Sequence, residues 1–231
     1  MLCRWEQLPG FMRTEEVRPY YEVLKKHWFG LLVKRTFDFV MSSVMLIILS
    51  PVFLSLAIWI KRDSEGPVFY RQERVTQYGR RFRIYKFRTM VQNADKIGSL
   101  VTVGGDSRIT NAGKKLRGCR LDELPQLINI WKGEMTFVGT RPEVPKYVKQ
   151  YTKEMYATLL LPAGVTSEAS IEFKDEDSIL AERTSKGKST DEAYVDDVLE
   201  RKMKWNLCMI KTFSLCKELA ILLKTVKAVI E

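Results

Sequence analysis

One long apolar run dominates the pattern of hydrophobic and polar positions along this chain. Positions 40–60 hold 21 consecutive residues without a charged side chain. As an α-helix the run would extend roughly 31 Å, which is enough to cross the hydrocarbon core of a bilayer. It lies too far from position 1, and is too poor in small-residue cleavage sites, to be a removable signal peptide. The run therefore predicts a membrane segment.

A Ser-Pro break divides this run. Pro51 removes an intrahelical hydrogen bond, so a kink is expected next to Ser50, and each half then measures only about 15 Å. Basic pairs at positions 34–35 and 61–62 flank the run, so the charge asymmetry that orients a spanning helix is missing. The residues leave two alternatives. A kinked spanning helix is favoured because such helices tolerate proline, and a helix that returns to the face it entered is the other.

The flanking pattern predicts an amphipathic helix and a β-hairpin. Aromatic and apolar residues recur at helical spacing in positions 20–32, with lysines between them, which is typical of a helix lying on a membrane interface. Strand-forming clusters at 68–70 and 82–87 surround a turn near Tyr78 and Gly79. This arrangement predicts a two-stranded hairpin.

Beyond the hairpin the pattern predicts helices separated by loops. Helices are expected at 124–131, 144–159 and 202–230. The last two mix lysines with apolar residues as interfacial helices do, although a soluble surface helix fits 144–159 nearly as well. Loops are expected at 93–118 and at the lysine-rich segment 185–191. The first loop is expected from its glycines, which are Gly98, Gly104, Gly105 and Gly113. The prediction is a mostly α protein with a small β-hairpin.

The charge balance points to an anionic partner. The chain has 38 Lys and Arg against 28 Asp and Glu, a formal net charge of +10. Such an excess suits nucleic acid, anionic lipid or a phosphorylated substrate. No nucleic-acid motif is present, so nucleic acid is not expected. The four cysteines form no CxxC pair and His27 is the only histidine, so zinc is not expected and the thiols are expected to be reduced and cytosol-facing. His27 is expected to be a packing or interfacial residue.

Two adjacent carboxylates are the main candidates for chemistry. Asp122 suits the N-cap of the helix expected at 124–131, and Glu123 suits its first turn. Capping and catalysis are compatible, because a helix N-terminus favours anions such as phosphate. Adjacent helical residues point about 100° apart, so the two carboxylates cannot act as a symmetric pair. They suit divided roles, one reacting and one holding a cation.

Basic residues near these carboxylates could bind phosphate. Guanidinium groups hold phosphate oxygens with two parallel hydrogen bonds, and a lysine adds a point charge. Each residue taken alone is more often a solvated surface residue. Pro142 restricts the backbone at the position before it and so helps to aim that side chain. The candidates are Lys86, Arg88, Arg117, Arg120 and Arg141.

Six segments in order resemble the bacterial sugar transferase family, whose members are monotopic phosphoglycosyl transferases. They are KRTFD (34–38), the Ser50-Pro51 break, GPVFYRQER (66–74), KFRTM (86–90), LDELPQL (121–127) and KGEMTFVGTRP (132–142). The resemblance spans roughly residues 24–141 and continues weakly to the C-terminus.

The resemblance implies a membrane topology. It reverses the preference above, because the family's membrane helix enters and leaves on the cytoplasmic face, with Lys34, Arg35 and Asp38 at its start and Ser50 and Pro51 at its break. The expected domains are an N-terminal interfacial segment (1–33), a re-entrant membrane helix (34–62) and a cytosol-facing catalytic domain with interfacial helices (63–231). The implied location is the cytoplasmic face of the bacterial inner membrane, with a phospholipid bilayer as partner. A homo-oligomer is left open.

The resemblance also implies a reaction. Asp122 would be the nucleophile that attacks the β-phosphate of a UDP-sugar, releasing UMP and leaving an aspartyl phosphosugar for transfer to polyprenyl (undecaprenyl) phosphate. Glu123 would aid Asp122 in binding Mg²⁺. Lys86, Arg88, Arg117 and Arg141 would contact phosphate or uridine. Such a reaction would be the first membrane step in assembling an exopolysaccharide, O-antigen or glycoprotein glycan.

Three residues depart from the family pattern, and one rival function stays open. The departures are Thr76, Arg120 and Thr140. None of them belongs to the adjacent pair Asp122 and Glu123, called the dyad below. The rival is a membrane-anchored, non-catalytic binder of an anionic lipid or polymer. Charge and the apolar run fit that function equally well, but it leaves the two carboxylates unexplained.

Overall fold

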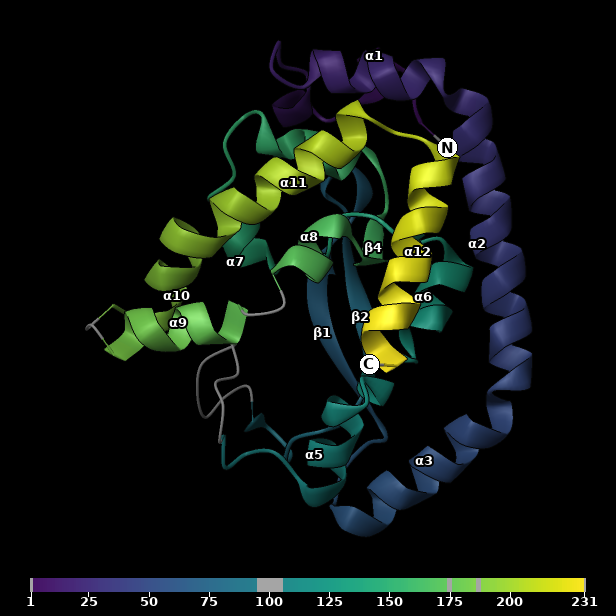
Figure 1. The fold of residues 1–231 in the computed structure, drawn as a ribbon, viewed down its shortest axis with the longest axis vertical. Helices are drawn as coiled ribbons and strands as arrows, with labels where there is room; N and C mark the ends of the chain where they lie inside the picture. The colour runs from purple at the N-terminus through teal and green to yellow at the C-terminus, as the bar shows by residue number, and fades with distance from the viewer. Residues whose placement is uncertain (1, 95–105, 174–175, 186–187, 231) are drawn as a thin grey trace.

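A pair of long helices meeting at a sharp bend forms one side of the molecule. This computed structural model describes residues 2–94, 106–173, 176–185 and 188–230. Helix α2 (Trp28–Ile48) and helix α3 (Ser50–Asp63) meet at an angle of 61° (Figure 1). No single helix in the described part of the chain is long and apolar enough to cross a membrane, whereas this bent pair together passes that test of length and composition.

The bend lies where the Ser-Pro break predicts it. Pro51 has no N–H to donate to the carbonyl of Ile47, and the Ser50 hydroxyl donates to that carbonyl instead at 2.8 Å. Leu49 joins the two helices, accepting from the Phe53 N–H at 2.9 Å. The predicted kink is confirmed.

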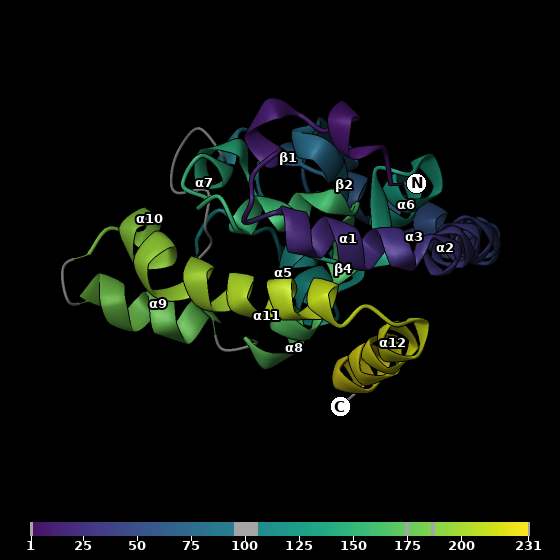
Figure 2. The same ribbon diagram turned by 90° about the horizontal axis from the view of Figure 1, so that it is seen from above.

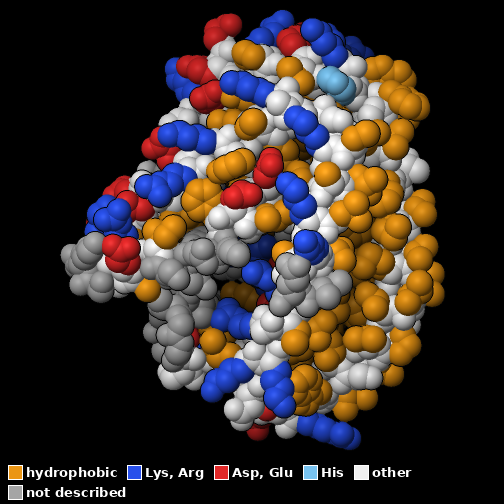
Figure 3. All heavy atoms as spheres, viewed as in Figure 1, with side chains coloured by type: hydrophobic (Ala, Val, Ile, Leu, Met, Phe, Trp, Pro, Cys, Tyr) orange, Lys and Arg blue, Asp and Glu red, His pale blue; other side chains and the backbone are white. Residues whose placement is uncertain are grey.

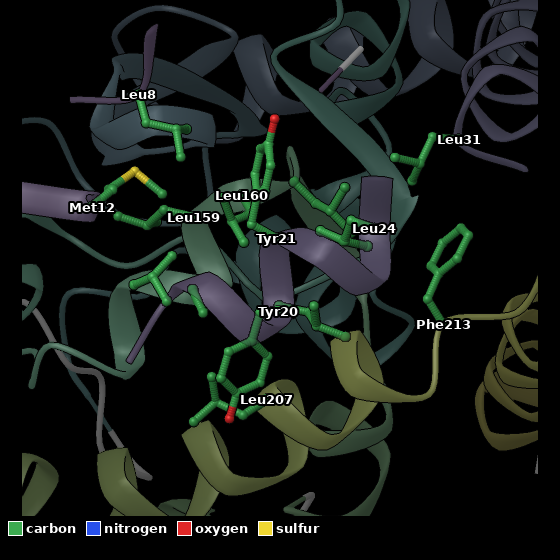
Figure 4. Packing of buried hydrophobic residues seen from close by; sticks show 14 of the residues in the cluster. Leu8, Met12, Tyr20, Tyr21, Leu24, Leu31, Leu159, Leu160, Leu207 and Phe213 are labelled. Carbon is green, nitrogen blue, oxygen red and sulfur yellow. The ribbon is translucent and has the colours of Figure 1, made fainter. Parts of the chain in front are cut away.

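The N-terminal segment packs against the body of the protein. Its elements are η1 (Trp5–Gln7), η2 (Gly10–Met12) and α1 (Arg18–Lys26). Tyr20, Tyr21 and Leu24 of α1 are buried in a cluster with leucines of the later chain, such as Leu160 and Leu207 (Figure 4). The expectation that these three side chains face a membrane interface is therefore wrong, because the protein core already covers them.

Two small sheets lie beside the bent helices. Strand β1 (Phe69–Val75) pairs antiparallel with β2 (Arg81–Phe87) around the turn η3 (Gln77–Gly79), where Tyr78 and Gly79 both have positive φ. The predicted hairpin is confirmed. Strands β3 (Met135–Val138) and β4 (Ala163–Thr166) form a parallel pair that the sequence pattern did not predict. These strands have only four residues each, which is too short for a clear alternation.

The remaining helices surround the sheets. These helices are α5 (Asn111–Gly118), η4 (Leu121–Glu123), α6 (Gln126–Lys132), α7 (Pro145–Val148), η5 (Met155–Leu160), α8 (Glu168–Glu172), α9 (Glu176–Ser185), α10 (Thr190–Ala193), the π-helical turn η6 (Tyr194–Leu199), α11 (Glu200–Lys211) and α12 (Leu215–Ile230). Helices α9 and α10 lie on the opposite side of the molecule from α2 (Figure 2). Helix α6 confirms the helix expected at 124–131.

Three other predictions about the later chain need correction. The helix expected at 144–159 is broken into α7 and η5, whose apolar residues enter two different cores and are buried rather than interfacial. The helix expected at 202–230 is α11 and α12, which separate where Phe213 turns into the core. Helix α5 lies within the segment expected to be a loop.

Parts of the two predicted loops lie outside the described residues. Gly98, Gly104 and Gly105 of the first loop are outside the described residues, and so are positions 186–187 of the second loop. The end of the second loop is helical, because α10 begins at Thr190 with Ser189 as its N-cap.

The middle of α2 is attached to β3 and α6, the two elements that follow Asp122 and Glu123 in the chain. Asp38 accepts hydrogen bonds from the Thr136 hydroxyl (2.7 Å) and the Phe137 N–H (3.1 Å) of β3. Lys34 donates to the carbonyl of Val138 at 2.7 Å. All three predicted start residues, Lys34, Arg35 and Asp38, are thus in contact with this region of the protein.

Arg35 makes the third of these connections. Its guanidinium donates to the carbonyls of Ile130 (2.8 Å) and Trp131 (3.1 Å) at the end of α6. Carbonyls in the last turn of a helix lack intrahelical partners and accept such donors. The apolar helix α2 and the short helix that follows the dyad therefore form one unit.

Candidate active site

A cavity of 460 Å³ lies beside the hairpin, with a wall formed by β1, β2, the segment after β2, α5 and η4. Among the residues that the structure describes, its charged lining consists of six cations and one carboxylate, which are Arg71, Arg74, Lys86, Arg88, Arg108, Arg117 and Asp122. Lys and Arg side chains are visible in a hollow over this region (Figure 3). A concave site with this excess of positive charge suits an anionic ligand.

Asp122 supplies the carboxylate of the cavity. It lies in the single turn η4, which follows Arg120 in the left-handed conformation. The expectation that Asp122 caps a helix is wrong, because α6 begins at Gln126 and no side chain caps it. Burial raises the pKa of Asp122, while the positive charges of Lys86 and Arg117 oppose the rise. The group is therefore a poorly solvated carboxylate beside fixed cations.

Glu123 points away from the cavity into a cluster of cations. Lys86 donates to its Oε1 at 2.8 Å, and the two Nη atoms of Arg141 donate to both carboxylate oxygens, one of them at 3.2 Å. Burial by itself would raise the pKa of Glu123, but Arg141 and Lys86 hold it well below its usual value. The two carboxylates thus have separate environments, in agreement with the geometry predicted for adjacent residues.

Lys86 and Arg141 both bind Glu123. Lys86 comes from β2, lines the cavity and has its pKa lowered by burial, which the charge of Glu123 opposes. Arg141 follows β3, and its Nη1 also donates to the carbonyl of Val165 at 3.4 Å. The structure brings Lys86, Glu123 and Arg141 together from three elements far apart in sequence.

Arg88 is directed toward the end of α3. Its Nη2 donates to the carbonyl (2.7 Å) and hydroxyl (2.9 Å) of Ser64, just after α3. Its Nε and Nη1 are buried and have no hydrogen-bond partner among the described residues. Arg88 therefore joins the end of α3 to the cavity wall. Arg117, from α5, lines the cavity and lowers the pKa of Asp122.

Several cavity residues were missed by the sequence analysis. Arg71, Arg74 and Arg108 line the cavity, and Arg108 forms an ion pair with Asp106 at 2.6 Å. The pairing of the two hairpin strands could have predicted that Arg74 lies on the same face as Lys86. Lys86 lies opposite Tyr70, and residues at alternate positions of a strand share one face, so position 74 belongs to the same face.

The donor chemistry of the dyad fits a magnesium ion. Among the described residues no group of three or more His, Cys, Asp or Glu could hold a metal. Mg²⁺ is, however, commonly held by one or two carboxylates together with water and substrate phosphates. Asp122 faces a cavity where phosphates would lie. Glu123 already accepts three hydrogen bonds, but a carboxylate has about four lone-pair sites, so it retains capacity for a further partner.

Comparison with known proteins identifies the relatives of this chain. A UDP-N-acetylgalactosamine-undecaprenyl-phosphate N-acetylgalactosaminephosphotransferase from Aeromonas hydrophila is 35% identical over 86% of the chain. A UDP-glucose:undecaprenyl-phosphate glucose-1-phosphate transferase from Klebsiella pneumoniae is 31% identical over 93% of it. A putative undecaprenyl-phosphate N-acetylgalactosaminyl 1-phosphate transferase from Bacillus subtilis is 38% identical over 65% of it.

The relatives differ from this chain in length. The match covers 44% of the Aeromonas and Klebsiella proteins and 78% of the Bacillus protein. The model of the bacterial sugar transferase family matches residues 29–231, which include almost all of α2, the whole of α3, the hairpin, Asp122 and Glu123. The chain therefore belongs to the bacterial sugar transferase family.

Proposed function

We propose that this chain transfers a sugar-1-phosphate from a UDP-sugar to undecaprenyl phosphate and releases UMP. One observation carries the proposal: among the described residues, Asp122 is the one carboxylate that lines the cavity, and the other charged lining residues are cations. Such a site binds an anionic diphosphate and presents a nucleophile to it. The names of the relatives, which pair UDP-sugars or sugar phosphates with undecaprenyl phosphate, support the two substrates.

In the first half-reaction a carboxylate oxygen of Asp122 attacks the β-phosphorus of the donor. A bond from this oxygen to phosphorus forms, the bond from phosphorus to the bridging oxygen breaks, and UMP leaves with the electron pair. In the second half-reaction a phosphate oxygen of undecaprenyl phosphate attacks the same phosphorus and releases Asp122. The burial that raises the pKa of Asp122 also removes water that would stabilise its charge, which favours attack.

The cations of the site reduce the repulsion between the reacting anions. Lys86 reaches both environments, because it lines the cavity and bonds Glu123. Arg141 is aimed at the dyad by two hydrogen bonds to Glu123, and Arg117 faces the cavity from α5. Positively charged groups fixed before the reaction stabilise charge that develops on the leaving group.

Mg²⁺ is proposed as the cofactor, with Asp122 and Glu123 as its protein ligands. When bound, it would neutralise phosphate charge and stabilise the departing UMP. Glu123 is kept ionised at neutral pH by Lys86 and Arg141, which lower its pKa, and so remains able to bind a cation.

We further propose that α2 and α3 enter and leave the membrane on one face. The two helices meet at 61°, and neither is both long and apolar enough to cross a membrane alone. The pair is attached to the protein body through Asp38 within α2, which binds β3, and through Ser64 after α3, which binds the cavity residue Arg88. A bacterial inner membrane with the site on its cytoplasmic face would let a soluble donor and a lipid acceptor reach Asp122 in turn.

Asp122→Asn tests the proposed reaction. Asparagine keeps the size of the side chain but is a far weaker nucleophile, so UMP release should fall by about a thousandfold or more. The measurement uses purified enzyme, UDP-sugars, undecaprenyl phosphate and Mg²⁺, with Asp196→Asn as a control for loss of an exposed acid. Donor labelled at the β-phosphate should leave label on wild-type protein but not on the variant. Substantial UMP release by Asp122→Asn would reject the nucleophile, and a wild type that binds anionic lipid but never releases UMP would favour the non-catalytic binder.

A further inference from the structure

Arg74 is a cavity cation that no step of the proposed reaction uses. It lies on β1, and its side chain lines the cavity together with Lys86 and Asp122. Its Nε and Nη2 donate to the Gln72 side-chain oxygen at 3.1 and 2.6 Å, and its Nη1 donates to the carbonyl of Pro142 at 3.0 Å. These contacts hold the guanidinium in one orientation at the cavity wall.

Among the described residues, no carboxylate forms a direct ion pair with Arg74. Its three hydrogen bonds all go to neutral oxygens. Glu143 is the acid that acts on it most strongly through space, but the carboxylate of Glu143 accepts a hydrogen bond from the Tyr194 hydroxyl. The like charge of Arg141 opposes that of Arg74, and burial lowers the pKa of Arg74. A partly buried cation without a direct ion-pair partner gains from the arrival of an anion.

The guanidinium also has donors to spare. An arginine carries five N–H groups, and three of those of Arg74 are used by Gln72 and Pro142. The two that remain are one on Nη1 and one on Nη2, and each can donate to a phosphate oxygen.

Arg74 is connected to the dyad through the backbone that it holds. Pro142 directly follows Arg141, whose side chain binds Glu123. A second bond, from the Val75 N–H to the carbonyl of Glu143 at 2.9 Å, fixes the same segment against β1. An anion that binds Arg74 would therefore lie next to the segment that aims Arg141.

We propose that Arg74 binds the diphosphate of the nucleotide-sugar donor and, through Pro142, positions Arg141 at the dyad. The assignment rests on the proposed function, because it takes the donor to be a UDP-sugar. Arg74 on β1 would then bind the diphosphate together with Lys86 on β2 and Arg117 on α5. The diphosphate would thus be held by both strands of the hairpin and by α5.

Binding of UDP to the full-length protein tests the proposal. Arg74→Gln removes hydrogen bonds that carry a positive charge, so its Kd for UDP should rise by about ten- to a hundredfold. The Kd is measured by titration calorimetry. Arg74→Lys keeps the positive charge but loses the guanidinium group and its several N–H donors, so its Kd should lie between those of wild type and Arg74→Gln. Arg83→Gln, which removes an exposed arginine of β2 outside the cavity, should leave the Kd unchanged.

Salt dependence separates binding from a purely structural role. A direct charge contact is screened by salt, so the Kd of wild type should rise more steeply with salt than that of Arg74→Gln. Arg74→Gln with wild-type affinity, or with an unchanged salt dependence, would overturn the proposal. Should Arg74→Gln not fold, a folded Arg74→Lys with the wild-type Kd overturns it equally. Failure of the wild type itself to bind UDP or release UMP would instead overturn the proposed function.

Discussion

At the scale of single residues, the site places two neighbouring carboxylates in opposite electrostatic environments. Burial raises the pKa of Asp122, whereas Arg141 and Lys86 hold the pKa of Glu123 well below its usual value. The adjacency of the two acids was visible in the sequence, and so was the conclusion that they point apart. Which of them faces the cavity was not, because that depends on Lys86 and Arg141, residues 37 and 18 positions away from Glu123.

The departures from the family pattern also have physical roles. The Thr76 hydroxyl donates to the carbonyl of Glu134 (2.6 Å) and accepts from the Ala163 N–H (3.1 Å), so it connects the hairpin to the second sheet. The carbonyl of Thr140 accepts from the Gly164 N–H at 2.8 Å. Arg120 takes the left-handed conformation that begins η4. None of the three lines the cavity.

The first prediction concerns the pH dependence of UMP release in Lys86→Gln. Attack requires ionised Asp122, so the rate should rise with pH through the pKa of this group, which burial raises above its ordinary value. The charge of Lys86 opposes that rise, so removing it should move the acid limb of the profile to higher pH. The measurement is kcat for UMP release across the pH range, with Arg83→Gln as the control. An acid limb that stays in place or moves to lower pH would contradict the proposed roles.

At the scale of elements, local pattern predicted those whose residues carry a strong periodic or turn signal. The hairpin, the break at Ser50 and Pro51, and the helix α6 all follow from such signals. The segment 144–159 has equally regular apolar spacing but forms α7 and η5, because its residues enter two separate cores. The spacing of apolar residues could not distinguish one helix that packs on one core from two short helices that pack on two cores.

The second prediction is that Pro51→Leu straightens the bend between α2 and α3. Leucine restores the N–H that can donate to the carbonyl of Ile47, and proline within a helix is unfavourable by about 3 kcal/mol. Single cysteines at Lys25 and Glu65, in a background without the native cysteines, should label from one side of the membrane in the wild type. In Pro51→Leu a fraction should label from opposite sides. The reagent is a membrane-impermeant maleimide applied to intact and opened vesicles. Labelling from opposite sides in the wild type would reject the re-entrant topology.

At the scale of the whole molecule, exposed apolar side chains gather on the side formed by α2 and α3 (Figure 3). Helix α12 extends this surface with one stripe of exposed residues, which are Leu215, Leu219, Leu223 and Val226. Its opposite side is attached to the protein, because Glu218 pairs with Lys34 at 2.8 Å and the hydroxyls of Thr225 and Thr166 lie 2.8 Å apart. An apolar stripe of this kind, beside the exposed apolar surface of α2 and α3, suits contact with lipid.

The third prediction is that Leu219 of α12 lies in the lipid phase. Burying a leucine side chain is favourable by about 1.5–3 kcal/mol, so a bilayer should cover the stripe. A spin label at Leu219→Cys, in reconstituted vesicles and without the native cysteines, should be more accessible to oxygen than to a water-soluble nickel complex. The control is Thr152→Cys, at an exposed position before η5, which should show the reverse. Equal behaviour of the two labels would place α12 in water.

The sequence by itself determined the features that depend on neighbours along the chain. These are the apolar run and its break, the hairpin, and the adjacency of Asp122 and Glu123, because periodicity, proline and turn residues act over a few positions. Only the tertiary structure decided which side chains meet. It buried Tyr20 in the core, directed Arg88 to Ser64, and brought Arg74 to the cavity. Burial and ion pairing depend on distances in space between residues far apart in sequence, and no local pattern records them.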